Sequence, residues 1–153
     1  MWPELVYSGT TTALSSVKDG LSGEQVGDYA LFAGGMNTSS TTYYNTVDTY
    51  NEGLVKGTAT ALSDSVEGMG SVSFDDYALF GGGTNGAVLY PIRQTIDVYD
   101  ESLTRTNPIS LSAKRHYLQG AKIGNYALMA GGYNGNWSAT YLATIDAYDS
   151  SLT

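Results

Sequence analysis

The chain of 153 residues lacks cysteine altogether and has a single histidine. Without cysteine there are no disulfide bonds, no thiol nucleophile and no cysteine-ligated zinc. The longest apolar stretches are only a few residues, so no membrane insertion is expected. Residues 1–4 (MWPE) show neither the basic nor the apolar region of a secretory signal. These absences leave the cellular location open.

Basic residues are also scarce, with 7 Lys and Arg against 15 Asp and Glu and a formal net charge of −8. A surface that follows nucleic-acid phosphates needs clustered Lys and Arg. The one local basic group is residues 114–116 (KRH). We therefore expect no nucleic-acid partner, and solubility is a sufficient reason for the acidic balance.

Glycine and tyrosine are abundant where charge and proline are not, with 19 glycines and 13 tyrosines against 3 prolines. Frequent Tyr and Thr favour strands, and regularly spaced glycines favour tight turns. No stretch shows sustained helical periodicity. The composition predicts an all-β protein.

An internal repeat organises the whole chain. Residues 29–35 (YALFAGG) return 48 positions later as residues 77–83 (YALFGGG), and 49 further on as residues 126–132 (YALMAGG). A second motif recurs at a spacing of 49, as residues 47–50 (VDTY), 96–99 (IDVY) and 145–148 (IDAY). Agreement between separate motifs identifies three copies of one structural unit.

Each unit reads as short antiparallel strands. The YALF-type run is an apolar strand bounded by turn residues, which suits burial on both faces. A strand precedes it, the V/I-D-x-Y motif forms a third strand, and a Thr-rich fourth covers about residues 54–60 and 103–109. Four such strands make one β-propeller blade. The predicted blades are about residues 10–58, 59–106 and 107–153.

These residues resemble the kelch repeat, in which an apolar strand ends in Gly-Gly and a Tyr lies in the third strand. The resemblance covers nearly the whole chain and implies a β-propeller of three kelch-type, four-stranded blades. Kelch units usually carry a Trp in the fourth strand, where this chain has Leu54, Leu103 and Leu152. The subtype is therefore atypical, and is more similar to repeats of bacterial and phage surface proteins than to animal kelch adaptors.

Three blades cannot close a ring, because propellers have about four to eight. Residues 4–10 (ELVYSGT) align with the fourth strand that begins at Leu54, whereas the third unit reaches residue 153 without one. We therefore expect a homodimer in which residues 1–10 complete a blade of the other chain, giving a six-bladed ring. The alternative is that the chain belongs to a longer propeller.

Three long connections, residues 36–46, 84–94 and 133–144, differ in sequence while the strands around them repeat. Variable loops on a repeated scaffold are typical of a binding surface. Their aromatic and amide side chains suit a glycan or a protein ligand. Arg115 lies where kelch repeats often place an arginine, and with His116 it is expected at the channel mouth. The candidate ligand-binding residues are Tyr43, Tyr44, Asn85, Tyr90, Arg93, Arg115, His116, Tyr133, Asn134, Asn136, Trp137 and Tyr141.

No catalytic or metal-binding motif occurs, so we expect no catalytic residue, no metal and no cofactor. Asp48, Asp97 and Asp146 recur at one blade position, which favours hydrogen bonds to neighbouring backbone. The preferred hypothesis is a non-catalytic binding or assembly module. A structural ring within a larger particle is the alternative, and a sugar epimerase like those of six-bladed kelch type is a third. An epimerase would need Arg115, His116 or Glu67 to converge with a carboxylate near the axis.

Overall fold

The computed structural model describes residues 4–39, 41–86, 91–135 and 140–151. Every regular element in these ranges is a β-strand, as the sequence predicted. None of the described residues belongs to a helix that is long and apolar enough to cross a membrane.

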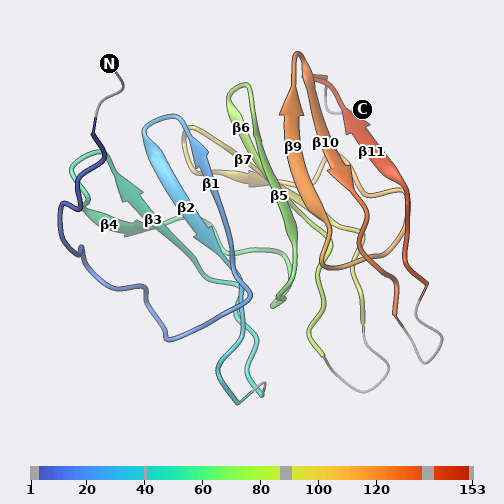
Figure 1. The fold of residues 1–153 in the computed structure, drawn as a ribbon, viewed down its shortest axis with the longest axis horizontal. Coiled ribbons are helices and arrows are strands. Elements are labelled where there is room, and N and C mark those ends of the chain that lie inside the picture. Colours follow the sequence, from blue (N-terminus) through green and yellow to red (C-terminus); the bar gives the residue numbers. More distant parts are fainter. Residues whose placement is uncertain (1–3, 40, 87–90, 136–139, 152–153) are drawn as a thin grey trace.

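The strands form three consecutive antiparallel sheets, which we call blades 1, 2 and 3 (Figure 1). Blade 1 contains β1 (Ser22–Val26), β2 (Tyr29–Ala33), β3 (Val47–Asn51) and β4 (Lys56–Thr58). Blade 2 contains β5 (Gly70–Phe74), β6 (Tyr77–Gly81), β7 (Ile96–Asp100) and β8 (Arg105–Thr106). Blade 3 contains β9 (Gln119–Ile123), β10 (Tyr126–Ala130) and β11 (Ile145–Tyr148). In each blade the strands pair in chain order.

The fourth strands are shorter than the sequence predicted. Leu54 and Leu103 adopt φ of 57° and 62° and lie in the turns before β4 and β8 instead of in the strands. A residue in the left-handed region cannot continue a pleated strand. The fourth strands therefore start two residues later than expected.

The core consists of two layers of side chains, one between each pair of neighbouring blades. We call the side of a blade that meets the preceding blade its front face, and the side that meets the following blade its back face. On the back face of blade 1, Val26, Leu31 and Val47 are at most 2 % exposed. They pack on the front face of blade 2, which includes Phe80 and Tyr99. The same contact recurs between blades 2 and 3.

Burial of the second strand depends on its place in the row of blades. In blade 2, Ala78, Leu79 and Phe80 are all buried, as expected for a strand covered on both faces. In blades 1 and 3 the second strand alternates between buried and partly exposed positions. The prediction of burial on both faces is therefore confirmed only for the blade with two neighbours.

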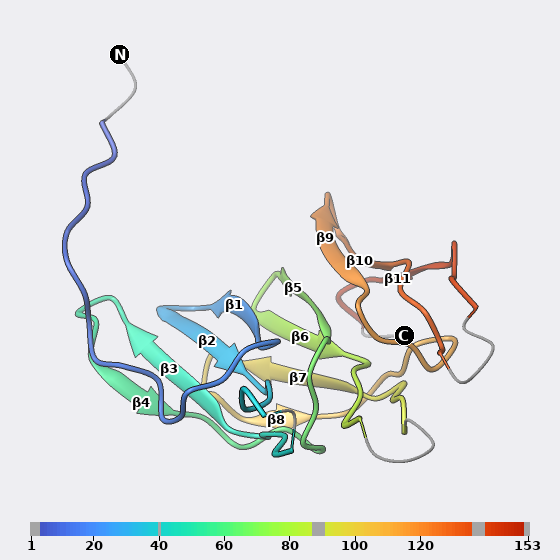
Figure 2. The same cartoon turned by 60° about the horizontal axis from the view of Figure 1, so that its bottom comes forward.

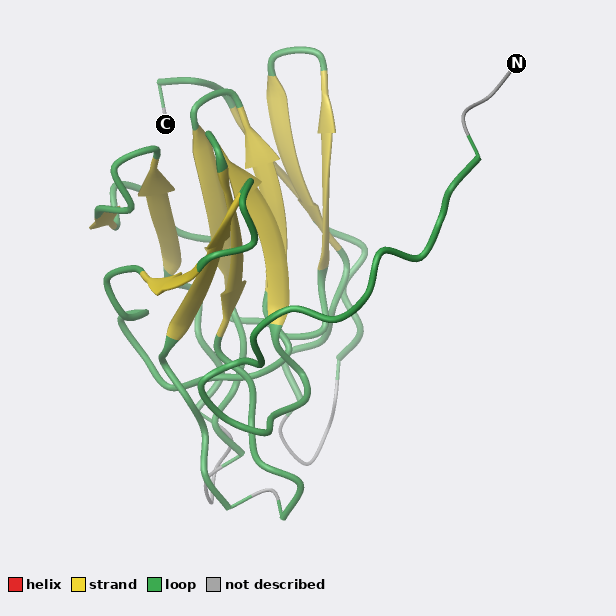
Figure 3. Ribbon diagram, turned by 90° about the vertical axis from the view of Figure 1, so that its left-hand side faces the viewer, coloured by secondary structure: helices red, strands yellow, loops and turns green. Residues whose placement is uncertain are grey.

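The three blades form an open row. Figure 2 shows the sheets following one another without the third returning to the first. Figure 3 shows the N-terminal segment leaving the body of the protein as an extended strand-like stretch. In it, Leu5, Val6 and Tyr7 are 97 %, 78 % and 81 % exposed. The edge of β11 that corresponds to the β4 and β8 positions carries no strand in the described part of blade 3.

Candidate functional site

All three long connections emerge at one end of the blades, which we call the loop face. Figure 1 shows them together at the lower edge, with the short β1–β2, β5–β6 and β9–β10 turns at the opposite end. This gathering follows from strand order, because every second-to-third connection leaves its sheet in the same direction. The variable segments of the three repeats are thus brought to one surface.

The bases of these loops are built identically. Gly35, Gly83 and Gly132 each accept a backbone hydrogen bond through their carbonyl oxygen, from the amides of Tyr44, Arg93 and Leu142 respectively, at 2.8–2.9 Å. The glycine pairs have positive φ throughout, for example 69° and 98° at Gly34 and Gly35. This conformation favours glycine. The glycine pairs thus give the three loops the same base, and the loop residues beyond them differ.

Blade 3 carries an aromatic cluster at this end, formed by His116, Tyr117, Tyr133 and Tyr141. The His116 ring contacts two tyrosine rings, with centroids 4.6 Å from Tyr117 and 4.1 Å from Tyr133, and those two rings stack on each other at 6.1 Å. The ring centroids of Tyr133 and Tyr141 are 5.7 Å apart, and Tyr141 is 81 % exposed. The cluster thus runs from a buried histidine to an open aromatic ring.

His116 is unusual because it is 3 % exposed and neither ring nitrogen has a hydrogen-bond partner among the described residues. Burial lowers the pKa of the imidazole below its ordinary value, because the charged form would lose its hydration. The structure therefore favours a neutral His116 that packs against two tyrosine rings.

Glu67 occupies the position in blade 2 that His116 occupies in blade 3, and Asp19 is their counterpart in blade 1. The backbone pairings Asp19–Met36, Glu67–Thr84 and His116–Tyr133 show this equivalence. Tyr117 Oη donates a 3.4 Å hydrogen bond to Glu67 Oε1, which links the two blades. The pKa of Glu67 is raised, mainly by burial and also by the nearby charge of Asp19. Glu67 and His116 thus flank Tyr117 from two blades.

Arg115 precedes His116 in the chain but does not belong to the aromatic cluster. It is completely buried, and its Nη2 lies 2.6 Å from Asp146 Oδ2 and 3.1 Å from the carbonyl oxygen of Met129. This arrangement leaves the side chain no surface for a ligand. The sequence predicted Arg115 at a channel mouth, whereas its side chain is bonded inside blade 3.

The remaining candidates on the loop face are spread along it. Tyr43, Tyr44 and Asn85 are half-buried, and Arg93 Nε forms a 2.9 Å ion pair with Asp64 Oδ2. Asn134 is exposed and accepts a 3.3 Å hydrogen bond from the amide of Thr140. The structure therefore joins Tyr133, Tyr141 and His116 directly. Three further candidates lie outside the described residues: Tyr90, Asn136 and Trp137.

The recurrent aspartates have the predicted structural role. Asp48, Asp97 and Asp146 accept hydrogen bonds from the backbone amides of Ser15, Ser63 and Ser112, respectively, at distances of 2.9–3.3 Å. Each aspartate thus ties the segment that approaches its blade to the third strand. Regular repetition of the contact in all three blades is typical of a structural clip.

Sequence reasoning did not select Tyr117, which the structure places at the centre of the cluster. The signal was present in the repeat, because Tyr117 replaces Gly20 and Gly68 of the other units. All three have positive φ, at 62°, 63° and 53° in chain order. A bulky residue at a glycine position of a repeat indicates a local requirement beyond folding.

Two further observations bear on chemistry. No group of three or more His, Asp or Glu side chains that could hold a metal occurs among the described residues.

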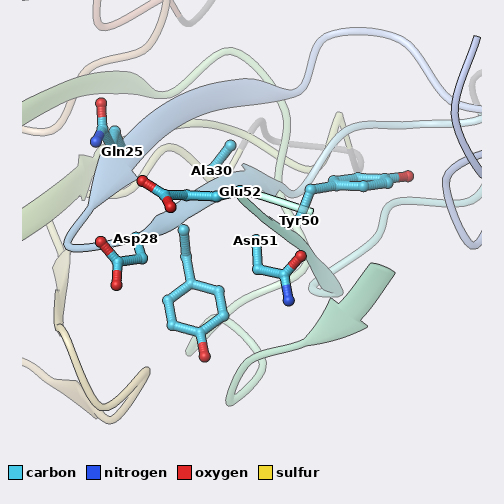
Figure 4. A pocket seen from close by; sticks show the side chains of 7 residues that line it. Gln25, Asp28, Ala30, Tyr50, Asn51 and Glu52 are labelled. Carbon is cyan, nitrogen blue, oxygen red and sulfur yellow. The ribbon is translucent and has the colours of Figure 1, made fainter. Parts of the chain in front are cut away.

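A shallow hollow of about 210 Å³ lies near the short-turn end of blade 1, and includes Asp28, Tyr50 and Glu52 (Figure 4). It shares Ala30 and Tyr50 with the larger groove on the front face of blade 1. The hollow is therefore part of an open blade face.

The fold and this surface define an all-β protein of consecutive propeller-like blades with a variable loop face. Among solved structures, that of YjhT superposes with a TM-score of 0.74 at 15 % sequence identity. The match covers 94 % of this chain and 45 % of YjhT, so the chain spans less than half of the length of YjhT. No family model and no curated protein matches the sequence. The similarity to YjhT shows the fold.

Proposed function

We propose that the chain is a non-catalytic binding or assembly module of kelch-like blades that recognises a glycan or a protein through its loop face. The observation that carries this proposal is the aromatic cluster at the base of a variable loop, ending in the open ring of Tyr141. Exposed aromatic rings next to amide side chains are typical of sugar and protein recognition. The identical loop bases support it, because a fixed frame carries differing tips.

The test is a glycan array, together with a displayed peptide library, probed with the wild-type chain and with Tyr141→Ala. Tyr141 is 81 % exposed, so its removal should leave the fold intact while weakening binding at least several-fold. Asp76→Ala, in the exposed turn at the opposite end, is the matched control and should bind as the wild type does. Binding that survives Tyr141→Ala but is lost on Asp76→Ala would place the ligand elsewhere and refute a loop-face function.

We further propose that a second copy closes the row of blades into a six-bladed ring. The free back face of blade 3 supports this, because it presents apolar side chains whose counterparts are buried. Ile123 and Ile145 are 65 % and 60 % exposed, whereas their counterparts in blade 2, Phe74 and Ile96, are 0 % exposed. Apolar surface of this kind favours association.

The free front face of blade 1 is the complementary half of the same interface. It forms a groove of about 510 Å³. In blade 2 the counterparts of its apolar side chains, Leu62, Ala78, Phe80 and Tyr99, cover the back face of blade 1. The two contacts within the chain therefore indicate the occupant of the groove, which is the back face of another blade 3. The groove is lined by Thr11, Thr12, Ala13, Leu14, Leu21, Ala30, Phe32, Tyr50 and Leu54.

The space around the glycines that follow the second strands supports the proposed contact between two copies. A Cβ added at Gly34 would lie 2.6 Å from the carbonyl oxygen of Val66 in the next blade, and one at Gly82 would overlap that of Arg115. At Gly131 the nearest atom to such a Cβ is 3.8 Å away, within the same blade. Gly131 thus keeps a small residue at a place that no blade of the same chain approaches among the described residues. The exposed segment at Leu5–Tyr7 and the uncovered edge of β11 support exchange of the fourth strand.

Light scattering across a concentration range tests the ring. The wild-type mass should be twice 16.2 kDa. Phe32→Asp in the groove and Ile145→Asp on the back face should each give monomers, because each buries a charge in an apolar contact. Thr38→Asp on a loop is the control and should remain dimeric. A folded wild-type monomer at all concentrations would contradict the ring of two copies, and would favour closure by further blades of a longer chain.

A further inference from the structure

One backbone position distinguishes blade 3 from its two neighbours. At this position the chain adopts the left-handed conformation in every blade, with Gly20, Gly68 and Tyr117 at φ of 62°, 63° and 53°. Glycine takes this conformation without steric penalty, but a tyrosine does not. Blades 1 and 2 show that the fold itself is satisfied by glycine. Asp75 also stands where the other blades have glycine, but aspartate tolerates the left-handed region and a bulky tyrosine rarely does. The tyrosine therefore points to a function at this position.

The Tyr117 ring is held in place on several sides. It packs against Gly68, where an added Cβ would come within 2.8 Å of Tyr117 Cε1. Its hydroxyl donates to Glu67 Oε1, and His116 lies behind it at 4.6 Å between ring centroids. Tyr117 nevertheless stays 52 % exposed. The result is a fixed aromatic surface that is open on part of its area.

Tyr117 borders a cavity of about 460 Å³ that lies along the inner strands β1, β5 and β9. This volume suits a small ligand such as a mono- or disaccharide. The lining is mostly polar and contains many backbone groups, because glycine and serine predominate in it. The residues around the cavity are Gly20, Leu21, Ser22, Gly23, Glu24, Gly68, Met69, Ser71, Tyr117, Leu118, Gln119 and Gly120.

The charge of the cavity lining favours neutral over anionic ligands. Among the described residues that line it, Glu24 is the one carboxylate and there is no Lys, Arg or His. Glu67 accepts the hydrogen bond of the Tyr117 hydroxyl. An anionic ligand would find no opposite charge there. Carboxylate, hydroxyl, amide and backbone groups can instead bond the hydroxyls of a neutral sugar, while an aromatic ring contacts its apolar face.

We propose that this axial cavity binds a neutral sugar ring stacked on Tyr117. This inference rests on the proposed binding function and names both its ligand class and its position. In this proposal the sugar lies against the inner strands β1, β5 and β9. The variable loops contact further sugar units of a longer glycan. Tyr117 is the binding platform, and Glu67 and His116 position it.

The chain itself offers the decisive variant, Tyr117→Gly. Glycine is the residue that the other two blades use at this φ, so the variant should fold as well as the wild type does. Saturation-transfer NMR and calorimetry would be run with glucose, galactose, mannose and N-acetylglucosamine, and with glucuronate as the acidic counterpart. Binding of at least one neutral sugar is expected, weakened roughly tenfold by Tyr117→Gly from the loss of aromatic contact. Glucuronate should not compete.

Tyr141→Ala separates the two proposals, because Tyr141 belongs to the loop face and does not line the cavity. It should retain monosaccharide binding and lose affinity only for longer glycans. If Tyr117→Gly binds sugars like the wild type while Tyr141→Ala does not, the axial site is refuted and the loop-face function stands. Preference for glucuronate, or no binding of any neutral sugar by the wild type, would also refute the axial site.

Discussion

Arg115 Nη2 lies 2.6 Å from Asp146 Oδ2, in a pair whose side chains are 0 % and 11 % exposed. Asp48 has two cations instead, Lys18 and Lys56, at 3.3 and 3.4 Å, and Asp97 has Arg105 at 3.6 Å. Lys56 and Arg105 come from the fourth strands. Blade 3 has no fourth strand in the described part of the chain, and its aspartate is neutralised by an arginine that precedes the first strand. The aspartate of blade 1 is thus paired from both sides, that of blade 2 from the fourth strand, and that of blade 3 from the segment before the first strand.

Removing the aspartate of this pair should destabilise the protein strongly. Asp146→Ala leaves Arg115 buried without its counter-charge, which costs about 3–5 kcal/mol of unfolding free energy. Lys122→Ala is the comparison, because it breaks the exposed 3.2 Å pair with Asp75 and should cost about 0–1 kcal/mol. Urea denaturation measures both. Equal effects would contradict a structural role for the buried pair.

The burial of His116 against tyrosine rings predicts a fall in stability on mild acidification. The pKa of His116 is lower in the folded than in the unfolded chain, where it is ordinary, so the folded state favours neutral imidazole. Its contribution is present above the unfolded pKa of about 6.5 and is lost as the pH falls through the lower folded value. Thermal unfolding followed between neutral pH and pH 5 should show this, and His116→Phe should remove it.

Glu67 affects the predicted pH dependence of stability only at a lower pH than His116 does. Its pKa is raised on folding, so its neutral form is favoured and protonation makes folding more favourable as the pH falls toward the range of carboxylates. The two groups thus act in opposite directions. A stability curve without a decline below pH 6.5, for a wild-type chain that keeps its fold, would show that His116 is not held neutral.

Two glycines test which blade contacts exist within one chain. Gly82→Ala would push a methyl group into the carbonyl of Arg115, and so should lower the stability of the folded chain severely. Gly131→Ala meets no following blade, and carries only the cost of its positive φ of 69°. If a second copy closes the ring, Gly131→Ala should mainly weaken association, measured by light scattering. Loss of folding to an equal extent in both variants would contradict this distinction.

A tyrosine hydroxyl in each third strand holds the segment that links neighbouring units. Tyr50, Tyr99 and Tyr148 donate to the carbonyl oxygens of Thr12, Thr60 and Ser110 at 2.7, 2.8 and 2.9 Å. Tyr99 is fully buried. Tyr99→Phe should therefore cost about 1 kcal/mol of unfolding free energy.

Chemical denaturation of Tyr99→Phe is the measurement. Tyr7→Phe is its control, because Tyr7 is 81 % exposed and its hydroxyl is open to solvent. An unchanged midpoint for Tyr99→Phe would show that the hydrogen bond to Thr60 contributes nothing net.

The sequence alone determined the number of units, the order of the strands and the hydrogen-bonding role of the repeated aspartates. Period and turn chemistry are local properties, so the positions of the YALF-type strands, the glycine pairs and the clipping aspartates could be read from spacing. It also separated scaffold from variable loops. Leu54 and Leu103 were assigned to strands wrongly, since a turn with positive φ at leucine has no clear local signal.

Only the tertiary structure decided which side chains share a site. Arg115 and His116 are neighbours in the chain, yet Arg115 pairs with Asp146 inside blade 3 and His116 packs against Tyr117 and Tyr133. Tyr117 meets Glu67 across a blade boundary, over a separation of 50 residues. Contacts of this kind depend on how blades pack, because long-range packing brings together positions that no local pattern relates. The repeat specifies each blade, and the packing of one blade on the next creates the cavity.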